Sequence, residues 1–178
     1  MKIEKITPIH FGKAFSLEEI QISLPTGKLK VYDRINHRDS VTILPMDEKE
    51  NIWFVRQYRV GSSSELLELP AGMMEAGENP LACAQREIRE EIGMAARTWK
   101  QLGSYFLAPG YCTENNYAFL AQDLYISPLS MDEDEFLAIE RIPINEVLAM
   151  VKNCDLHDGK SLAALGVFFQ VRAVKSER

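Results

Sequence analysis

Three glutamates are spaced so that they share one face of a predicted helix. Glu87, Glu90 and Glu91 stand at i, i+3 and i+4, and in a helix these positions are neighbours. Like charges this close repel one another, so a positive partner is expected beside them. Oxygen ligands at this density suit a hard cation such as Mg²⁺ or Mn²⁺. The alternative is a Glu/Arg-rich helix with a solvated face, and the run 86–91 alone does not exclude it.

The segment that carries these carboxylates has clear start and stop signals. Asn79 is a suitable N-cap, Pro80 suits the first helical position, and Gly93 suits the C-terminal end. Apolar residues at helical spacing form a neighbouring face that can pack on a sheet. They are Leu81, Ala84, Ile88 and Ile92. The pattern predicts a helix over residues 80–92.

The rest of the chain predicts a mixed α/β protein. Strands are expected near residues 2–6, 18–23, 28–35, 40–46, 51–58, 65–69, 98–107, 117–125 and 136–142, and further helices near 144–152 and 160–174. Trp53, Phe54 and Val55 lie on an apolar strand and are expected in the core. This order favours an α+β or α/β sandwich over a doubly wound parallel sheet.

Composition describes one globular domain with a short extra arm. The 178 residues are 46% apolar and 26% charged, with a formal net charge of −6. The acidic balance argues against a nucleic-acid partner. The longest apolar run, 162–169, is far shorter than the roughly 18 residues of a membrane span, and residues 1–10 lack the apolar stretch of a signal peptide. Cys83, Cys112 and Cys154 lack metal-binding spacing, so we expect reduced thiols in a cytoplasmic protein.

The residues around the predicted helix match a long fixed-spacing motif. It runs from Gly72 through Glu78, the pair Arg86-Glu87 and the pair Glu90-Glu91 to Gly93 and Met94. The segment 72–94 resembles a complete Nudix box, a loop–helix–loop module that hydrolyses a nucleoside diphosphate linked to another group. Every defined position is filled.

The resemblance covers roughly residues 40–170. It implies the α/β fold of the family, the Nudix α/β/α sandwich with a mixed sheet, for a hydrolase domain over residues 38–178. Residues 1–37 match an N-terminal β arm that in related proteins exchanges between subunits. A homodimer is therefore expected.

The resemblance also implies roles for individual residues. Glu87, Glu90 and Glu91 match the ligands of a divalent metal, Mg²⁺ or Mn²⁺, and Glu90 is counted among the catalytic residues as well. The backbone carbonyl of Ala71 matches a further ligand. Arg86 matches a catalytic-site residue that orients the glutamates. Glu78 matches one that supports the loop–helix junction.

Stretches outside the box resemble the ADP-ribose pyrophosphatase branch of the family. Gln57-Tyr58-Arg59 precedes Leu67–Gly72, and Arg59 matches an arginine that contacts substrate phosphates. The alternative for Arg59 is a surface cation at a strand end. Pro109 follows Gly93 by 16 residues, a spacing associated with ADP-ribose hydrolysis. Gly110 adjoins it, and Glu114 stands where this branch carries an acidic residue near the substrate.

The catalytic base of this branch lies on a loop outside the box helix. The acidic run Asp132–Glu135 precedes the predicted strand 136–142. Alignment from that strand places Glu133 on the base position, with Glu135 as the fallback. A solvated acidic loop is the alternative.

The expected function is Mg²⁺-dependent hydrolysis of a nucleoside diphosphate sugar, with ADP-ribose converted to AMP and ribose 5-phosphate. One alternative is hydrolysis of GDP-mannose or another nucleotide sugar. A second is a Nudix module that binds a nucleotide sugar without turnover. The segment Asp158–Leu165 is interpreted as a helix start that contributes packing, because Gly159-Lys160-Ser161 lacks the upstream glycine of a P-loop.

Overall fold

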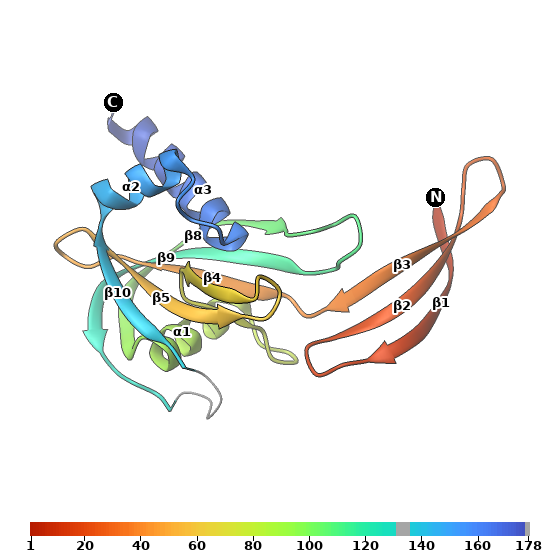
Figure 1. The fold of residues 1–178 in the computed structure, drawn as a ribbon, viewed down its shortest axis with the longest axis horizontal. Helices are drawn as coiled ribbons and strands as arrows, with labels where there is room; N and C mark the ends of the chain where they lie inside the picture. Colours follow the sequence, from red (N-terminus) through yellow and green to blue (C-terminus); the bar gives the residue numbers. More distant parts are fainter. Residues whose placement is uncertain (131–135, 177–178) are drawn as a thin grey trace. The chain divides into compact units, whose positions relative to one another are not determined.

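The computed structural model describes residues 1–130 and 136–176, with side chains through residue 173. Its strands are β1 (Lys2–Phe11), β2 (Phe15–Ser23), β3 (Leu29–His37), β4 (Ser40–Pro45), β5 (Asn51–Arg59), β6 (Ser64–Glu68), β7 (Ala71–Met73), β8 (Met94–Phe106), β9 (Asn115–Ile126) and β10 (Ala138–Pro143). Its helices are α1 (Pro80–Glu91), α2 (Ile144–Asn153) and α3 (Gly159–Ser176) (Figure 1). The chain divides into two compact units, residues 1–39 with 105–115, and residues 40–104 with 116–178.

The first unit is built on the antiparallel sheet β1-β2-β3. Ile20 on β2 lies opposite Ile6 on one side and Tyr32 on the other, so apolar side chains from three strands share a face. The segment 105–115 is fastened to β3: the Ile35 amide donates to the Tyr111 carbonyl at 2.7 Å, and Ile35 accepts from Thr113 at 3.0 Å. The arm therefore has a small body of its own. Its role in a dimer stays a prediction.

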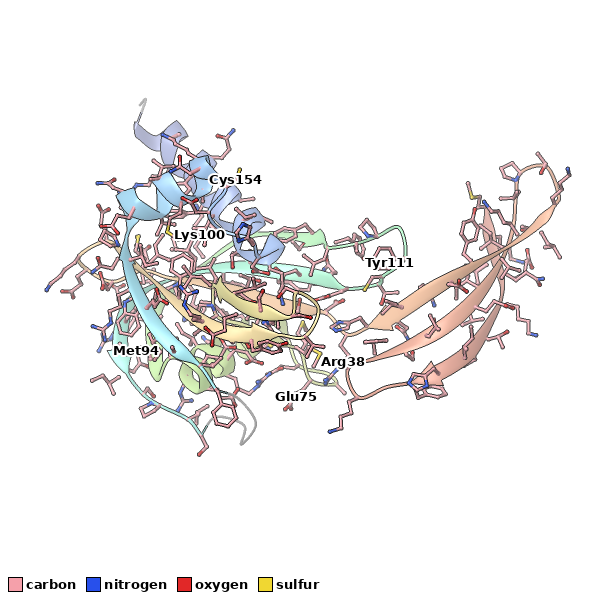
Figure 2. All side chains as sticks on the ribbon, viewed as in Figure 1. Arg38, Glu75, Met94, Lys100, Tyr111 and Cys154 are labelled. Carbon is pink, nitrogen blue, oxygen red and sulfur yellow. The ribbon has the colours of Figure 1, made fainter. Side chains whose placement is uncertain are left out.

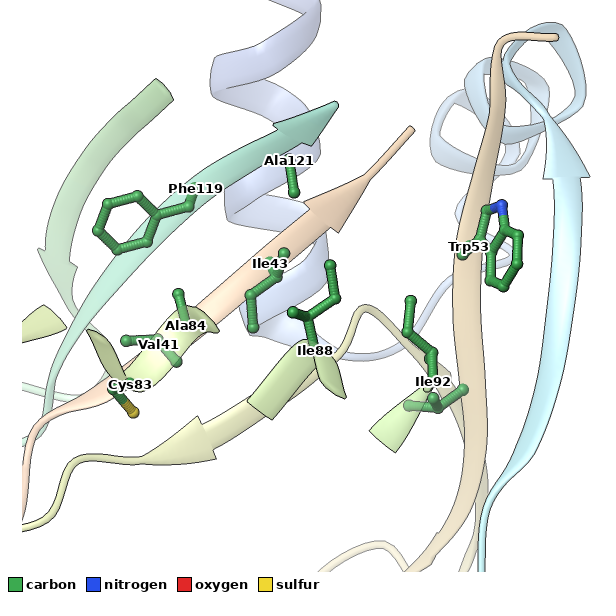
Figure 3. Close-up of a cluster of buried hydrophobic side chains, with 10 residues drawn as sticks. Val41, Ile43, Trp53, Cys83, Ala84, Ile88, Ile92, Phe119 and Ala121 are labelled. Atoms are coloured by element: carbon green, nitrogen blue, oxygen red, sulfur yellow. The ribbon is translucent and has the colours of Figure 1, made fainter. Parts of the chain in front are cut away.

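The second unit contains two sheets, ordered β10-β5-β6 and β7-β4-β9-β8. Strand β4 is fully buried, and it pairs parallel to β9 and antiparallel to β7. Helix α1 contacts β4 and β7, and α3 contacts β4 from the opposite side (Figure 1). Because successive strand residues point to opposite faces, β4 supplies both layers. Val41 and Ile43 pack with Ala84 and Ile88 of α1 in the main apolar cluster (Figure 3).

Helix α1 begins and ends where its sequence signals predict. The Asn79 side chain accepts a hydrogen bond from the Ala82 amide at 2.9 Å, and Pro80 is the first helical residue. After the C-cap Ile92, Gly93 turns the chain with a φ of 68°, a left-handed conformation that glycine adopts at low cost. The predicted helix is confirmed, and Ala84, Ile88 and Ile92 of its predicted apolar face are buried. Leu81, in the first turn, is 38% exposed and does not belong to the buried face.

The observed strands differ from the predicted ones mainly at their ends and in one addition. Strand β8 begins at Met94, four residues before the expected position, and β1 continues to Phe11. Strand β7 is only three residues long, too short to show an alternating pattern. Each of these segments gains its extended conformation from pairing with a neighbouring strand: β1 with β2, β7 with β4, and β8 with β9. Cys83 is buried, whereas Cys154, which caps α2, is exposed (Figure 2).

Candidate active site

Two of the three helix carboxylates meet at one guanidinium nitrogen. Arg86 Nη1 donates to Glu87 Oε1 at 2.7 Å and to Glu90 Oε2 at 2.8 Å. Both pairs are partly buried, with the glutamate side chains 12% and 25% exposed. Arg86 therefore supplies a positive partner for two of the three helix glutamates. It also orients two of them toward a common point.

The opposite edge of Arg86 is held by the loop that precedes the helix. Its Nε and Nη2 donate to the two oxygens of Glu78 at 3.1 and 3.0 Å, and Nη2 also donates to the Met73 carbonyl at 3.2 Å. Hydrogen bonds from Arg86 hold the pKa of Glu78 below its ordinary value, and the bond to Glu78 raises the pKa of Arg86. Both groups stay ionised, so the loop and the helix are clamped together electrostatically.

The third carboxylate, Glu91, is 4% exposed and faces the chain segment before the box. Its Oε2 accepts a hydrogen bond from the Ala71 amide at 3.0 Å. This bond joins the last turn of α1 to the residue whose carbonyl is predicted to bind metal. Sequence alone gives no signal for this contact, since the two residues are 20 positions apart.

Gly72 has a steric function that sequence reasoning missed. A Cβ built on Gly72 would overlap the carboxylate of Glu87, well inside the 3.0 Å limit that real Cβ atoms keep. Its φ is not among the positive values of the chain. Glycine is therefore required here for space rather than for backbone conformation. The Glu87 carboxylate lies directly against the Gly72 backbone.

Arg59 forms a paired interaction at the end of β5. Its Nε and Nη2 donate to the two oxygens of Glu68 at 2.8 and 2.6 Å, a bidentate geometry. Glu68 is 1% exposed, whereas the Arg59 side chain is 37% exposed. The hydrogen bonds to Glu68 raise the pKa of Arg59, and the negative charges of Glu91 and Asp158 add to this effect. Arg59 is thus anchored on one side and accessible on the other.

Cys83 lies inside the segment 72–94, beside Arg86 and the glutamates that it binds. It is fully buried, and its thiol contacts the Met73 carbonyl at 3.6 Å. Burial, and then the negative charges of Glu87 and Glu78, raise the pKa of the Cys83 thiol far above its ordinary range. The thiol therefore stays protonated, and we assign Cys83 a packing role within the box.

The remaining predicted site residues belong to the first unit or lie outside the residues that the structure describes. Pro109 and Gly110 form a turn in the first unit, closed by a hydrogen bond from Cys112 to the Ala108 carbonyl at 2.8 Å. They line a cavity of about 490 Å³ within that unit. Glu114, also in the first unit, lies 3.8 Å from His37 Nδ1. Glu133 and Glu135 lie outside the residues that the structure describes.

The carboxylates fit a divalent cation by their donor chemistry. Among the residues with described placement, no group of three or more His, Cys, Asp or Glu side chains is already arranged around a metal position. Two carboxylates nevertheless converge on one positive nitrogen. Glu91 adds a third on the same helix, and hard cations prefer oxygen ligands of this kind. Glu87, Glu90, Glu91 and the Ala71 carbonyl are the groups that would hold the ion.

Comparison with known proteins defines the class of the site. The sequence model of the NUDIX domain matches residues 36–165, so the chain belongs to the Nudix family. The chain is 28% identical over 172 residues to an ADP-ribose pyrophosphatase of Bacillus subtilis, covering 96% of this chain and 93% of the relative. It is 31% identical over 147 residues to a GDP-mannose pyrophosphatase of Enterobacter, covering 78% and 75%.

The fold also matches that of a solved relative. A crystal structure described as an ADP compounds hydrolase superposes with a TM-score of 0.87 at 26% identity, covering 98% of this chain and 95% of the other. The predicted family, the mixed α/β Nudix fold and the class of Nudix pyrophosphohydrolase are thereby confirmed. Family membership implies a divalent metal cofactor. Within residues 1–130 and 136–176, no helix is both long enough and apolar enough to cross a membrane.

Proposed function

We propose that this chain hydrolyses the diphosphate linkage of nucleoside diphosphate sugars, with ADP-ribose as the leading substrate and AMP and ribose 5-phosphate as products. The observation that carries the proposal is the arrangement of Glu87, Glu90 and Glu91 on the box helix, clamped by Arg86 and Ala71. The likeness to an ADP-ribose pyrophosphatase over nearly the whole chain supports this substrate.

The proposed cofactor is Mg²⁺ or Mn²⁺, held by the three glutamates and the Ala71 carbonyl. When bound, such a cation neutralises phosphate oxygens and lowers the pKa of an attacking water. Arg86 keeps the carboxylates oriented through its bonds to Glu87 and Glu90. Arg59, fixed by Glu68, would donate hydrogen bonds to the substrate phosphates.

The water must also lose a proton during in-line attack on the diphosphate. We propose that Glu133 accepts this proton, with Glu135 as the fallback. Pro109, Gly110 and Glu114 are proposed to contact the substrate. These assignments come from the family resemblance.

GDP-mannose is the second candidate substrate. The likeness to a GDP-mannose pyrophosphatase at 31% identity supports it. A binding module without turnover is disfavoured, because a pure binder has no need for three clustered glutamates on one helix.

A screen of substrates tests the proposal. ADP-ribose, GDP-mannose, other nucleotide sugars, dinucleoside polyphosphates and nucleoside triphosphates would be incubated with Mg²⁺ and alkaline phosphatase. Because the phosphatase acts on the monophosphate products of nucleotide-sugar cleavage, released phosphate reports turnover. Nucleoside triphosphates and other substrates with terminal phosphates need product separation by chromatography instead. ADP-ribose should be hydrolysed fastest. Failure to hydrolyse any nucleotide sugar would refute the proposal.

The metal assignment has its own variant. Glu91→Gln should nearly abolish turnover while the protein stays folded, because the amide keeps an acceptor for the Ala71 amide but loses the charge. The matched control is Glu75→Gln, since Glu75 is an exposed glutamate of the box loop (Figure 2). It should retain full activity. Unchanged activity of Glu91→Gln would refute the metal assignment.

We also infer a homodimer and a cytoplasmic location, without a nucleic-acid or membrane partner. Apolar side chains on the first unit support the dimer, since Ile3, Ile6 and Ile9 of β1 are 46–55% exposed and Phe11 is 77% exposed. Three free cysteines suit the cytoplasm. A monomer by light scattering at micromolar concentration would refute the dimer.

A further inference from the structure

The connection from β6 to β7 is buried, and each of its backbone groups named here is bonded to a different element. Leu69 donates its amide to Ser161 Oγ on α3 at 2.7 Å. The Pro70 carbonyl accepts from the Ile43 amide on β4 at 2.8 Å. The Ala71 amide donates to Glu91 on α1 at 3.0 Å. We call residues 68–71 the site linker. Three elements fix its position.

The bond from α3 has a defined direction. A backbone amide can only donate, so the Ser161 hydroxyl accepts from Leu69 and must place its own hydrogen elsewhere. That hydrogen goes to Asp158 Oδ2 at 2.6 Å. The same carboxylate oxygen accepts from the Ser161 amide at 2.8 Å, which makes Asp158 the N-cap of α3. Ser161 is completely buried, so solvent cannot replace its hydroxyl.

Two groups of the proposed site depend on the site linker. At its start, Glu68 binds one edge of the Arg59 guanidinium through both of its carboxylate oxygens. At its end, Ala71 holds the buried carboxylate of Glu91. A shift of the linker would therefore move a proposed phosphate ligand and a proposed metal ligand together.

We propose that Ser161, held by Asp158, is a positioning residue of the active site. Its hydroxyl fixes the site linker so that Ala71 and Glu91 are presented to the divalent cation and Arg59 to the diphosphate. This role rests on the proposed function, and it assigns to the start of α3 more than the packing that the sequence predicts. Packing of α3 alone requires apolar residues such as Leu165, which is fully buried, and gives no reason for a buried hydroxyl that bonds a linker 92 positions away.

The test compares Mn²⁺ binding, followed by electron paramagnetic resonance of the free ion, in four full-length variants. Ser161→Ala should weaken Mn²⁺ binding by about 10-fold, the lower end of the range for lost outer-shell partners, because Ser161 acts on Ala71 and Glu91 through the linker. Ser161→Thr keeps the hydroxyl and should bind within about threefold of the unaltered protein. Leu165→Val is the matched control, because it reduces buried packing on the same helix and leaves the Ser161 hydroxyl in place. It should lower the melting temperature and leave Mn²⁺ binding unchanged.

Asp158→Ala keeps the proposal testable if Ser161→Ala does not fold, because Asp158 is only half-buried. It should weaken Mn²⁺ binding in the same direction by a smaller factor. Equal binding in the altered and unaltered proteins would overturn the proposal, as would an equal loss in Leu165→Val. Turnover of ADP-ribose by the unaltered protein is measured alongside. Its absence would refute the proposed function, while the Mn²⁺ comparison would still decide the role of Ser161.

Discussion

Replacing Gly72 with alanine perturbs the site at a single atom. The added Cβ would overlap the carbon and both oxygens of the Glu87 carboxylate. The φ of Gly72 is not positive, so alanine does not strain the backbone. The atoms in the way belong to the end of a flexible side chain, which can turn aside. We therefore expect Gly72→Ala to fold and to displace Glu87.

The size of the effect follows from the displacement. To move from 1.9 Å to an ordinary contact of 3.4 Å, the Glu87 carboxylate must retreat by at least about 1.5 Å, which also disturbs its 2.7 Å bond to Arg86. A misplacement of about 1 Å in a catalytic site can reduce the rate by roughly 100-fold. This corresponds to about 2.7 kcal/mol of transition-state stabilisation. The loss of folding stability should stay below about 1 kcal/mol, because the side chain can move aside.

The assay is steady-state hydrolysis of ADP-ribose across a series of Mg²⁺ concentrations, with urea unfolding of the same samples. Gly103→Ala is the matched control, since a Cβ at Gly103 would meet no atom within 4 Å. It should match the unaltered protein in rate and in its Mg²⁺ requirement. A Gly72→Ala protein with full activity and an unchanged Mg²⁺ requirement would refute the assigned position of Glu87.

Further substitutions test the neighbouring contacts. Arg59→Lys keeps the charge but loses the two-pronged bond to Glu68, so kcat/KM for ADP-ribose should fall by about 10- to 100-fold; steady-state kinetics with an unchanged value would contradict the phosphate role. Glu68→Gln should lower the free energy of unfolding by about 1–3 kcal/mol, measured with urea, because it leaves the half-exposed guanidinium without its carboxylate. Partial burial alone would raise the pKa of Asp47, but hydrogen bonds from Asn51 and Trp53 outweigh it and hold that pKa below 3.8. This stabilisation is present above pH 4 and is lost as the pH falls through the folded-state pKa. Asp47→Asn should therefore be less stable by about 1–2 kcal/mol at pH 7, and the difference should shrink as the pH falls below 4; a difference independent of pH would exclude this account.

The box helix could be predicted from the sequence because its signals are local. Asn79 and Gly93 mark its ends within the segment itself, and the spacing of Glu87, Glu90 and Glu91 gives their common face. The order of most strands follows from similar local patterns. The predicted start of β8 is wrong by four residues, because pairing with β9 extends this strand back to Met94.

The support of the site could not be predicted in the same way. The bond between Ala71 and Glu91 and the bond between Leu69 and Ser161 join residues 20 and 92 positions apart. Both depend on how α1 and α3 pack around β4, which no local pattern encodes. The motif requires a glycine at position 72 but does not say why. In the structure, the Glu87 carboxylate occupies the space that a Cβ at this position would need.

The contacts of Arg86 with its glutamate partners affect the stability of the protein when no metal is bound. Arg86 contacts Glu78, Glu87 and Glu90 at once, so each of these glutamates already has a positively charged partner within the chain. Small metal-dependent domains unfold when chelators strip their ion, since their ligands have no other partner. In this protein the proposed ligands Glu87 and Glu90 have Arg86 as such a partner. Exhaustive chelation should therefore yield a folded, inactive enzyme that regains activity as soon as the cation is returned, without passing through an unfolded chain.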